Sequence, residues 1–292
     1  MRIKFIFHKV IFSLLLSILF PVVLFGYQYD LSVATIFKNN SPYLQEWIEY
    51  HRMMGVEHFY LYDNSSTDDP KTVLEPYIEE GVVTLIDWKN QHEESWGDQV
   101  FAWVWTTQIP AYHHAARTFK NKTKWMAFID TDEFITPMEG ASILPFLKRY
   151  DSYPGISLYW EVYGTSNVYD ILPGKLMIEL LTLKCNPEDS INQHTKIILK
   201  PKELNQFLDP HRCKFKNEKT GFVVPRETMR LNHYINRTVK FFYEHKVPNK
   251  QLMDNTKWSD EQIQLWSQLG NDVEDCTMDR FVPVLRKRMG LD

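Results

Sequence analysis

The sequence predicts an α/β fold in which helices flank a mixed, mainly parallel β-sheet. Short apolar runs rich in β-branched and aromatic residues alternate with longer amphipathic segments across residues 31–135. This is the pattern of strands joined by helical crossovers. The composition, 44% hydrophobic and 24% charged over 292 residues, is that of a globular protein. We therefore expect residues 29–292 to form one domain.

The first half of this domain is predicted to alternate strand and helix. In chain order we expect a strand at 31–37, a helix at 41–54, a strand at 58–62, a helix at 71–80, a strand at 82–86, a long helix at 98–119 and a strand at 124–130. Ser41 is the expected N-cap of the first helix, with Pro42 in its first turn and Gly55 at its end. Pro110 is expected to bend the long helix.

The second half is less regular and is predicted to extend the same sheet. We expect strands at 156–162, 195–200 and 228–234, and helices at 203–208, 238–246, 259–268 and 278–289. In sheets of this kind ligands bind beyond the carboxyl ends of the parallel strands. Two acidic clusters, 63–69 and 130–133, are predicted to fall there.

The N-terminus carries a targeting signal. Three basic residues precede an apolar run at 10–26, so the N-terminus should stay cytoplasmic and the rest should cross the membrane. The run is at the short limit for a span and longer than most signal-peptide cores. We expect residues 1–28 to be a signal anchor or a cleaved signal peptide, with the anchor favoured. The domain would then lie on the non-cytoplasmic side of a single-pass membrane protein (the Golgi lumen in a eukaryote), or be secreted after cleavage.

The net charge argues against a nucleic-acid-binding protein, and the cysteine content argues against a zinc protein. The net charge is -4 and no block of Lys and Arg stands out, so we expect no nucleic-acid partner. Cys185, Cys213 and Cys276 are far apart and form no CxxC motif, which argues against a zinc site. One disulfide is possible in an oxidising compartment, and the pair stays open.

The motif at Phe128–Phe134 places acidic residues directly after an apolar strand. Alternation along an extended chain would place Asp130 and Asp132 on the same side. Two such carboxylates can share a divalent cation with the oxygens of a nucleotide diphosphate. His233, near the end of a late strand, is a candidate third ligand. The alternatives are a solvated acidic turn and a packed histidine.

A second polar loop follows the strand at 58–62. Asp63 can accept hydrogen bonds from a ribose or a base edge, and Asn64 and Lys38 are grouped with it as nucleotide-sugar-binding candidates. Asp130 and Lys196 are also nucleotide-sugar-binding candidates, and we expect them to lie near the diphosphate. The alternative for Asp63 is a turn that caps the next helix. Other cations that could face a diphosphate are Lys200, Arg226 and Arg230.

A carboxylate is expected to act as general base on an acceptor hydroxyl. Glu161 is the first candidate, because aromatic residues and Gly164 surround it near a strand end. Asp209 and Glu227 are the other candidates. The alternative for the Glu161 segment is a structural turn at Gly164.

Three segments together are similar to a known family. Thr35–His51, Gly55–Asp68 and Phe128–Phe134 resemble glycosyltransferase family 92, also called DUF23. The resemblance implies a GT-A (Rossmann-like) fold, a divalent cation, usually Mn²⁺, a UDP-sugar donor and a glycan acceptor. Galactose transfer with inversion is implied for the same reason. On this basis residues 31–135 are the nucleotide-sugar-binding half and residues 136–292 the acceptor-binding half.

The resemblance also carries over to single positions. Asp130 and Asp132 match the family's DxD motif, and Asp63 matches the acidic residue expected near uridine. The late His-Tyr pair and downstream Lys of the family resemble His233, Tyr234 and Lys246. The following segment departs from the family, because Arg237-Thr238 stands where a Lys-Ser pair is usual.

Two other classes remain open from the sequence. One is a metal-dependent phosphoesterase that uses the same carboxylates, although no second metal cluster or nucleophile is evident. The other is an inactive sugar-binding membrane protein, against which the presence of both Asp130 and Asp132 argues.

Overall fold

The computed structural model describes residues 26–89, 103–249 and 257–291. The predicted signal anchor or signal peptide lies outside these ranges apart from its last three residues. Within the described ranges, none of the helices combines the length and the apolar character needed to cross a membrane.

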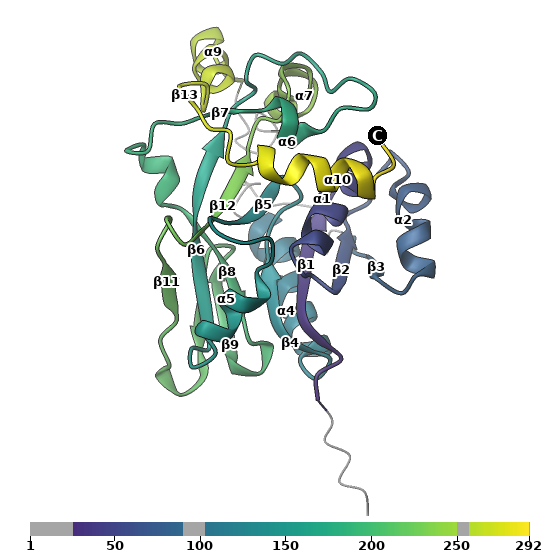
Figure 1. Ribbon diagram of the computed structural model, residues 1–292, viewed down its shortest axis with the longest axis vertical. Helices are drawn as coiled ribbons and strands as arrows, with labels where there is room; N and C mark the ends of the chain where they lie inside the picture. The colour runs from purple at the N-terminus through teal and green to yellow at the C-terminus, as the bar shows by residue number, and fades with distance from the viewer. Residues whose placement is uncertain (1–25, 90–102, 250–256, 292) are drawn as a thin grey trace, which may run out of the picture.

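Four parallel strands form the first half of the sheet, as predicted (Figure 1). They are β1 (Tyr29–Phe37), β2 (His58–Asp63), β3 (Val83–Asp87) and β4 (Thr123–Phe128), and their order in space is β4-β1-β2-β3. The crossovers contain α1 (Ser41–Met53), α2 (Pro70–Glu79) and α4 (Ile109–Phe119). A π-helical turn at Val104–Gln108 precedes α4, close to the expected bend at Pro110.

The second half extends the sheet with strands of both directions. Beside β4 lie β8 (Thr195–Leu199) and then β6 (Gly155–Tyr163), each antiparallel to its neighbour. Strand β12 (Met229–Tyr234) runs parallel to β6 and antiparallel to β5 (Glu133–Pro137). The short strands are β7 (Leu183–Lys184), β11 (Phe222–Val224) and β13 (Val273–Glu274), and β9 (Leu204–Asp209) pairs with β10 (Arg212–Phe215) in a separate hairpin. The predicted α/β class, with a mixed, mainly parallel sheet flanked by helices, is confirmed.

The remaining helices are short. They are α5 (Leu144–Arg149), α6 (Met177–Leu180), α7 (Val239–Phe241), α9 (Asp260–Gln268) and α10 (Val282–Arg288), with 3-10 turns at Ser190–Gln193, Pro201–Glu203, Lys216–Glu218 and Asp279–Phe281. The helix predicted at 259–268 is α9, and the one at 278–289 is a 3-10 turn followed by α10. The helix predicted at 238–246 is α7 continued by a π-helical turn at Phe242–Lys246.

Two predictions about local structure were wrong. The segment 203–208 is strand β9, although Leu204 and Phe207 have the spacing of an apolar helix face. Phe207 instead packs against Tyr112 and Phe128 from the hairpin side. Ser41 does not cap α1, because the helix already begins at that residue and no side-chain cap is made.

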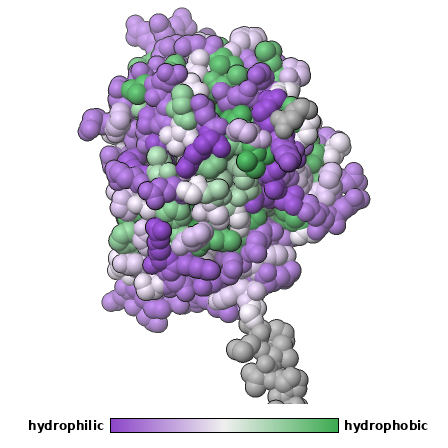
Figure 2. Space-filling view, viewed as in Figure 1, coloured by the Kyte–Doolittle hydropathy of each residue, from purple (hydrophilic) through white to green (hydrophobic). Residues whose placement is uncertain are grey.

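Helices cover both faces of the sheet. Figure 1 shows α1 and α10 in front of the sheet and α4 behind it. Trp47 and Ile48 of α1 belong to the larger apolar cluster, whereas Tyr112 of α4 packs with Phe128 and Phe207 in a second cluster on the other face. In Figure 2 hydrophilic residues predominate at the margins of the front face, and apolar residues show toward its middle.

His51 joins α1 to β5 inside the larger cluster. Its Nδ1 donates to the carbonyl of Trp47 at 2.8 Å, and its Nε2 accepts the backbone N–H of Ile135 at 3.3 Å. Protonation of Nε2 would place two donors face to face. Burial lowers the pKa of His51 to about 3, so the imidazole is neutral in the folded protein.

This neutral histidine should make folding sensitive to acid. An unfolded histidine takes up its proton near pH 6.5, and folded His51 does so only near pH 3, so the unfolded state binds more protons between these values. The free energy of unfolding should therefore fall as the pH falls through this window, by about 2 kcal/mol at pH 5. His51→Gln, which keeps a donor and an acceptor, should lose this part of the pH dependence in urea unfolding. An identical pH dependence in the two proteins would contradict the assignment.

Candidate active site

The chain reverses its direction at the acidic motif. Strand β5 runs opposite to β4, and the backbone N–H of Glu133 donates to the carbonyl of Asp130 at 3.1 Å to close the turn. The prediction that Asp130 and Asp132 alternate along an extended chain was therefore wrong. The Tyr234 N–H donates to the Asp132 carbonyl at 2.9 Å, and Trp47 Nε1 donates to the Glu133 carbonyl at 2.8 Å. The turn is thus held from both β12 and α1.

Asp130 forms an ion pair with the buried side chain of Lys196. The Lys196 Nζ lies 2.6 Å from Asp130 Oδ2 and 3.6 Å from Glu133 Oε2, and its side chain is 1% exposed. Burial alone would lower the pKa of Lys196, but Asp130 and Glu133 raise it well above its ordinary value. Tyr112 Oη lies 3.3 Å from the other Asp130 oxygen. Lys196 is therefore a charged partner of Asp130, and its contact with a diphosphate stays a prediction.

Asp132 and His233 come together on the other side of the turn. Asp132 Oδ2 and His233 Nε2 are 3.6 Å apart, and the two side chains are 18% and 7% exposed. Burial alone would raise the pKa of Asp132, but His233 and the cations Arg237 and Lys246 hold it well below its ordinary value. Burial lowers the pKa of His233, so its imidazole is available as a neutral ligand.

The spacing of this pair fits a divalent cation. A separation of 3.6 Å is too long for a hydrogen bond, but two ligands with bonds of about 2.1 Å to one ion can adopt it. Asp130 faces Lys196 instead, so the structure brings together two of the three predicted ligands. Among the described residues, only Cys185, Asp189 and Asp272 place three ligand atoms within 4.8 Å of one another. Burial, followed by the two carboxylates, raises the pKa of the Cys185 thiol to about 12, which opposes metal binding there.

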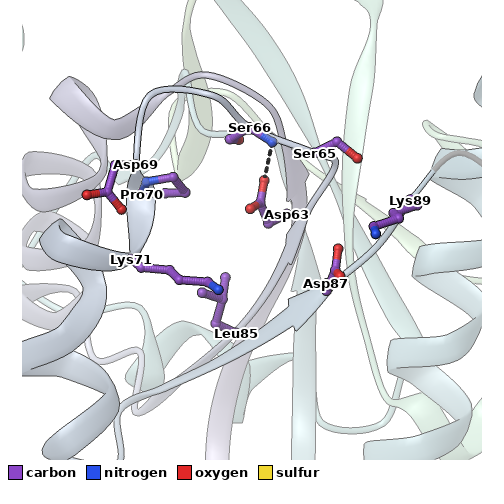
Figure 3. Close-up of a pocket in the computed structure, with 9 residues that line it drawn as sticks. All are labelled: Asp63, Ser65, Ser66, Asp69, Pro70, Lys71, Leu85, Asp87 and Lys89. Carbon is purple, nitrogen blue, oxygen red and sulfur yellow. Dashed lines mark hydrogen bonds between the residues drawn. The ribbon is translucent and has the colours of Figure 1, made fainter.

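Asp63 lies at the predicted sheet edge, beside a cavity. Its Oδ1 accepts the backbone N–H of Ser66 at 2.9 Å, which is the turn-capping alternative. The same carboxylate also lines a cavity of about 450 Å³, with Asp87 and two lysines at its margin (Figure 3). The cavity is lined by Asp63, Ser65, Ser66, Asp69, Pro70, Lys71, Leu85, Asp87 and Lys89. Turn and binding roles are thus compatible for Asp63.

The other two nucleotide candidates lie near the same edge. Asn64 is buried, donates to the carbonyl of Trp88 at 2.8 Å and accepts from Trp103 Nε1 at 3.2 Å. Its amide is therefore engaged in holding the loop. Lys38 is exposed one residue after β1.

Glu161, the first candidate base, is part of a buried ion-pair network. Its Oε1 lies 2.7 Å from Lys184 Nζ, which also pairs with Asp275 at 2.9 Å. Arg230, one of the cations considered for a diphosphate, pairs with Asp275 at 2.8 Å. Arg226 lies 3.6 Å from Glu161 Oε2. These charges neutralise one another and hold β6, β7 and β12 together, so the arrangement disfavours Glu161 as a base.

The two remaining carboxylates are also poorly suited to proton transfer. Asp209 accepts the backbone N–H of His211 and the side chain of Arg212, both at 2.7 Å. Glu227 lies in the turn before β12, and Met229, the first residue of that strand, is already about 13 Å from His233 at 3.3 Å per residue. This position disfavours Glu227 as the base, and its role stays a prediction.

Gly164 ends β6 in a tight backbone contact, which confirms the structural alternative for this segment. Its N–H donates to the carbonyl of Gly270 at 2.8 Å. A Cβ at Gly164 would lie 2.5 Å from the Leu269 carbonyl, and Gly270 has a φ of 80°. Only glycine fits both positions without a backbone shift.

Sequence reasoning missed two features near the turn. Arg237 is 1% exposed and has a φ of 50°, and its guanidinium lies 4.0 Å from the Tyr43 ring and 4.7 Å from the Phe241 ring. Its Nη2 lies 3.2 Å from Thr131 Oγ1, so it braces the acidic turn. The second feature is the imidazole of His211, which packs on Trp160. Each contact joins distant parts of the chain and has no local signal. The three cysteines are all free.

Removal of the Lys196 charge should be strongly destabilising. Lys196→Met would leave the buried Glu133 and the partly exposed Asp130 without their shared cation, which should cost about 3 kcal/mol, the lower end of the range for breaking a buried pair. Lys200→Met is the matched control, because Lys200 pairs with the half-exposed Asp151 and should contribute about 1 kcal/mol or less. Urea unfolding of the two variants measures the difference. Equal losses in both variants would contradict the assigned role of Lys196.

Comparison with known proteins places the chain in a family. The model of glycosyltransferase family 92 matches residues 28–268. The chain is 26% identical over 223 residues to a glycosyltransferase family 92 protein of Arabidopsis thaliana, which is 72% of this chain and 36% of that protein. It is 31% identical over 134 residues to a galactan β-1,4-galactosyltransferase of Arabidopsis thaliana, which is 44% of this chain and 25% of that protein. The chain thus spans little more than a third of these relatives, or less.

Likeness to solved structures is weaker. The UDP complex of TarS from S. aureus is 12% identical, with a TM-score of 0.37, and the match covers 82% of this chain and 69% of that chain. The family model includes all the strands and loops that carry the candidate site. The chain therefore belongs to glycosyltransferase family 92.

Proposed function

We propose that this chain is a metal-dependent glycosyltransferase that moves a sugar from a UDP-sugar to a glycan acceptor with inversion. The observation that carries the proposal is the pair of Asp132 and His233, 3.6 Å apart beside the acidic turn of a family 92 chain. Galactose is the proposed donor sugar, because two relatives are named galactan β-1,4-galactosyltransferases. Since the chain spans only part of those relatives, donor and acceptor belong to the proposal.

Asp132 and His233 would hold the cation, and Mn²⁺ is the ion we propose. When bound, it would supply Lewis-acid stabilisation of the negative charge on the departing diphosphate. Asp130 would be kept in place for the nucleotide sugar by its ion pair with Lys196. Lys196 would also add a fixed positive charge to this part of the site.

Asp63 would contribute to nucleotide binding from the neighbouring loop. One of its oxygens is occupied by the Ser66 N–H, and the carboxylate also lines the cavity described above. We propose that the ribose or base edge is bound there and that Lys38 contributes positive charge at the same edge. We also propose that residues 1–28 tether the domain to a membrane, with the catalytic side away from the cytoplasm.

Asp132→Asn should abolish most transfer without unfolding the protein. Loss of a ligand that supports several kcal/mol of charge stabilisation corresponds to a decrease of roughly 100-fold or more. The assay is transfer from UDP-galactose to galactan oligosaccharides with Mn²⁺, followed by mass spectrometry, and calorimetry measures Mn²⁺-dependent UDP binding. A screen of other UDP-sugars identifies the donor if galactose is not moved.

Asp151→Asn is the control for this experiment. Asp151 is a half-exposed carboxylate that pairs with Lys124 and Lys200 at the opposite end of the sheet, so transfer should be unchanged. Full activity of Asp132→Asn, or full activity of the wild type in excess chelator, would contradict the proposed metal dependence. Release of phosphate from UDP without sugar transfer would instead favour a phosphoesterase.

A further inference from the structure

The tip of the β9–β10 hairpin contacts the start of β8, next to Lys196. His211 is in this tip, and its Nδ1 lies 2.8 Å from the backbone carbonyl of Thr195. Thr195 begins β8 directly before Lys196, whose Nζ is 2.6 Å from Asp130. The hairpin therefore brings an imidazole to the edge of the sheet where the acidic turn lies.

Trp160 connects this imidazole to the candidate metal ligands. The ring of His211 packs edge-on against Trp160, with centroids 5.2 Å apart. Trp160 also contacts the His233 ring at 4.3 Å. His211 is thus separated by one aromatic ring from a residue that we propose to hold the cation.

The hydrogen bonds of His211 determine its tautomer. A carbonyl oxygen can only accept, so Nδ1 carries the proton that is donated to Thr195. Nε2 then has a free lone pair, and it makes no hydrogen bond to any residue in the ranges that the structure describes. The residue as a whole is partly exposed.

The carboxylates considered for proton transfer do not offer such an acceptor. Glu161 is neutralised by Lys184 at 2.7 Å, and Asp209 is paired with Arg212 at 2.7 Å. Asp209 instead shapes the hairpin tip, because its other oxygen accepts the N–H of His211. In the hairpin tip, His211 therefore has a nitrogen that can accept a proton, whereas both oxygens of Asp209 are already engaged.

We propose that His211 is the general base that accepts the proton of the acceptor hydroxyl, an inference that rests on the proposed glycosyl transfer. The hydroxyl gives its proton to Nε2 while its oxygen forms a bond to the anomeric carbon. The bond from that carbon to the diphosphate breaks, and its electron pair leaves with the nucleoside diphosphate. The proton then passes from Nε2 to water, which restores the neutral ring.

The protonation state of the free protein agrees with this role. Burial, and then the Lys196 ammonium, lower the pKa of His211 to about 4, against the opposing effects of Thr195, Asp130 and Asp209. The ring is therefore neutral near pH 7 and able to take a proton. The negative charge of a bound nucleotide diphosphate would make proton uptake easier during the reaction.

Substitution of His211 distinguishes a role as general base from a purely structural role. His211→Gln can still donate to Thr195 but cannot accept a proton, so kcat for transfer should fall by about 100-fold or more. Mn²⁺-dependent UDP binding, measured by calorimetry, should be unchanged. In His211→Ala, added imidazole should restore part of the transfer rate, because the site is partly exposed and a free base can occupy the space.

Asp151→Asn is the control, because this half-exposed carboxylate pairs with Lys124 and Lys200 at the opposite end of the sheet, so activity should stay within a few-fold of the wild type. Transfer at the wild-type rate by His211→Gln would overturn the proposal. So would a loss in both His211 variants that imidazole does not restore, since that result assigns a structural role. If the wild type itself moves no sugar from any UDP-sugar, the proposed function fails, and the His211 assignment fails with it. If the wild type transfers sugar and His211→Gln is fully active, His211 is not the base, and the proposed function still stands.

Discussion

The ion pair between the buried Lys196 and the partly exposed Asp130 is the interaction on which the candidate site depends. The chain must reverse at Asp130–Glu133 so that β5 can run antiparallel to β12, and the reversal concentrates three carboxylates at one turn. Two of them, Asp130 and Glu133, share the Lys196 ammonium at 2.6 and 3.6 Å. Buried carboxylates of like charge would repel one another without this cation. Asp132, on the other side of the turn, faces His233.

The rest of the fold fixes the position of this turn. Trp47 on α1 and Tyr234 at the end of β12 each hydrogen-bond to a carbonyl of the turn, and Arg237 contacts Thr131 between them. His51 then holds the next strand through the N–H of Ile135. The acidic motif is thus surrounded by contacts from helix, strand and loop, which is the preorganisation that electrostatic catalysis requires.

The sequence predicts local structure well and long-range contacts poorly. Strands β1, β2 and β4 are short apolar runs with polar ends, so their class, direction and sheet edge follow from local pattern and connectivity. Strand β9 was mistaken for a helix because Leu204 and Phe207 repeat with helical spacing, and the tertiary contact of Phe207 with Tyr112 decides otherwise. The family resemblance located the acidic motif and His233, but the pairing of Asp130 with Lys196 depends on the antiparallel neighbour β8. For the same reason the sequence did not predict the ion pair of Lys184 with Glu161 or the position of His211 near the site.

The central claim is that Asp132 and His233 hold one cation together while Asp130 stays with Lys196. The most direct measurement is pulsed electron paramagnetic resonance of the Mn²⁺-loaded chain with UDP, which detects nitrogen atoms bonded to the ion. We expect coupling to a single imidazole nitrogen in the wild type, and its loss in His233→Gln. A wild-type spectrum without any imidazole coupling, or one that His233→Gln leaves unchanged, would contradict the account.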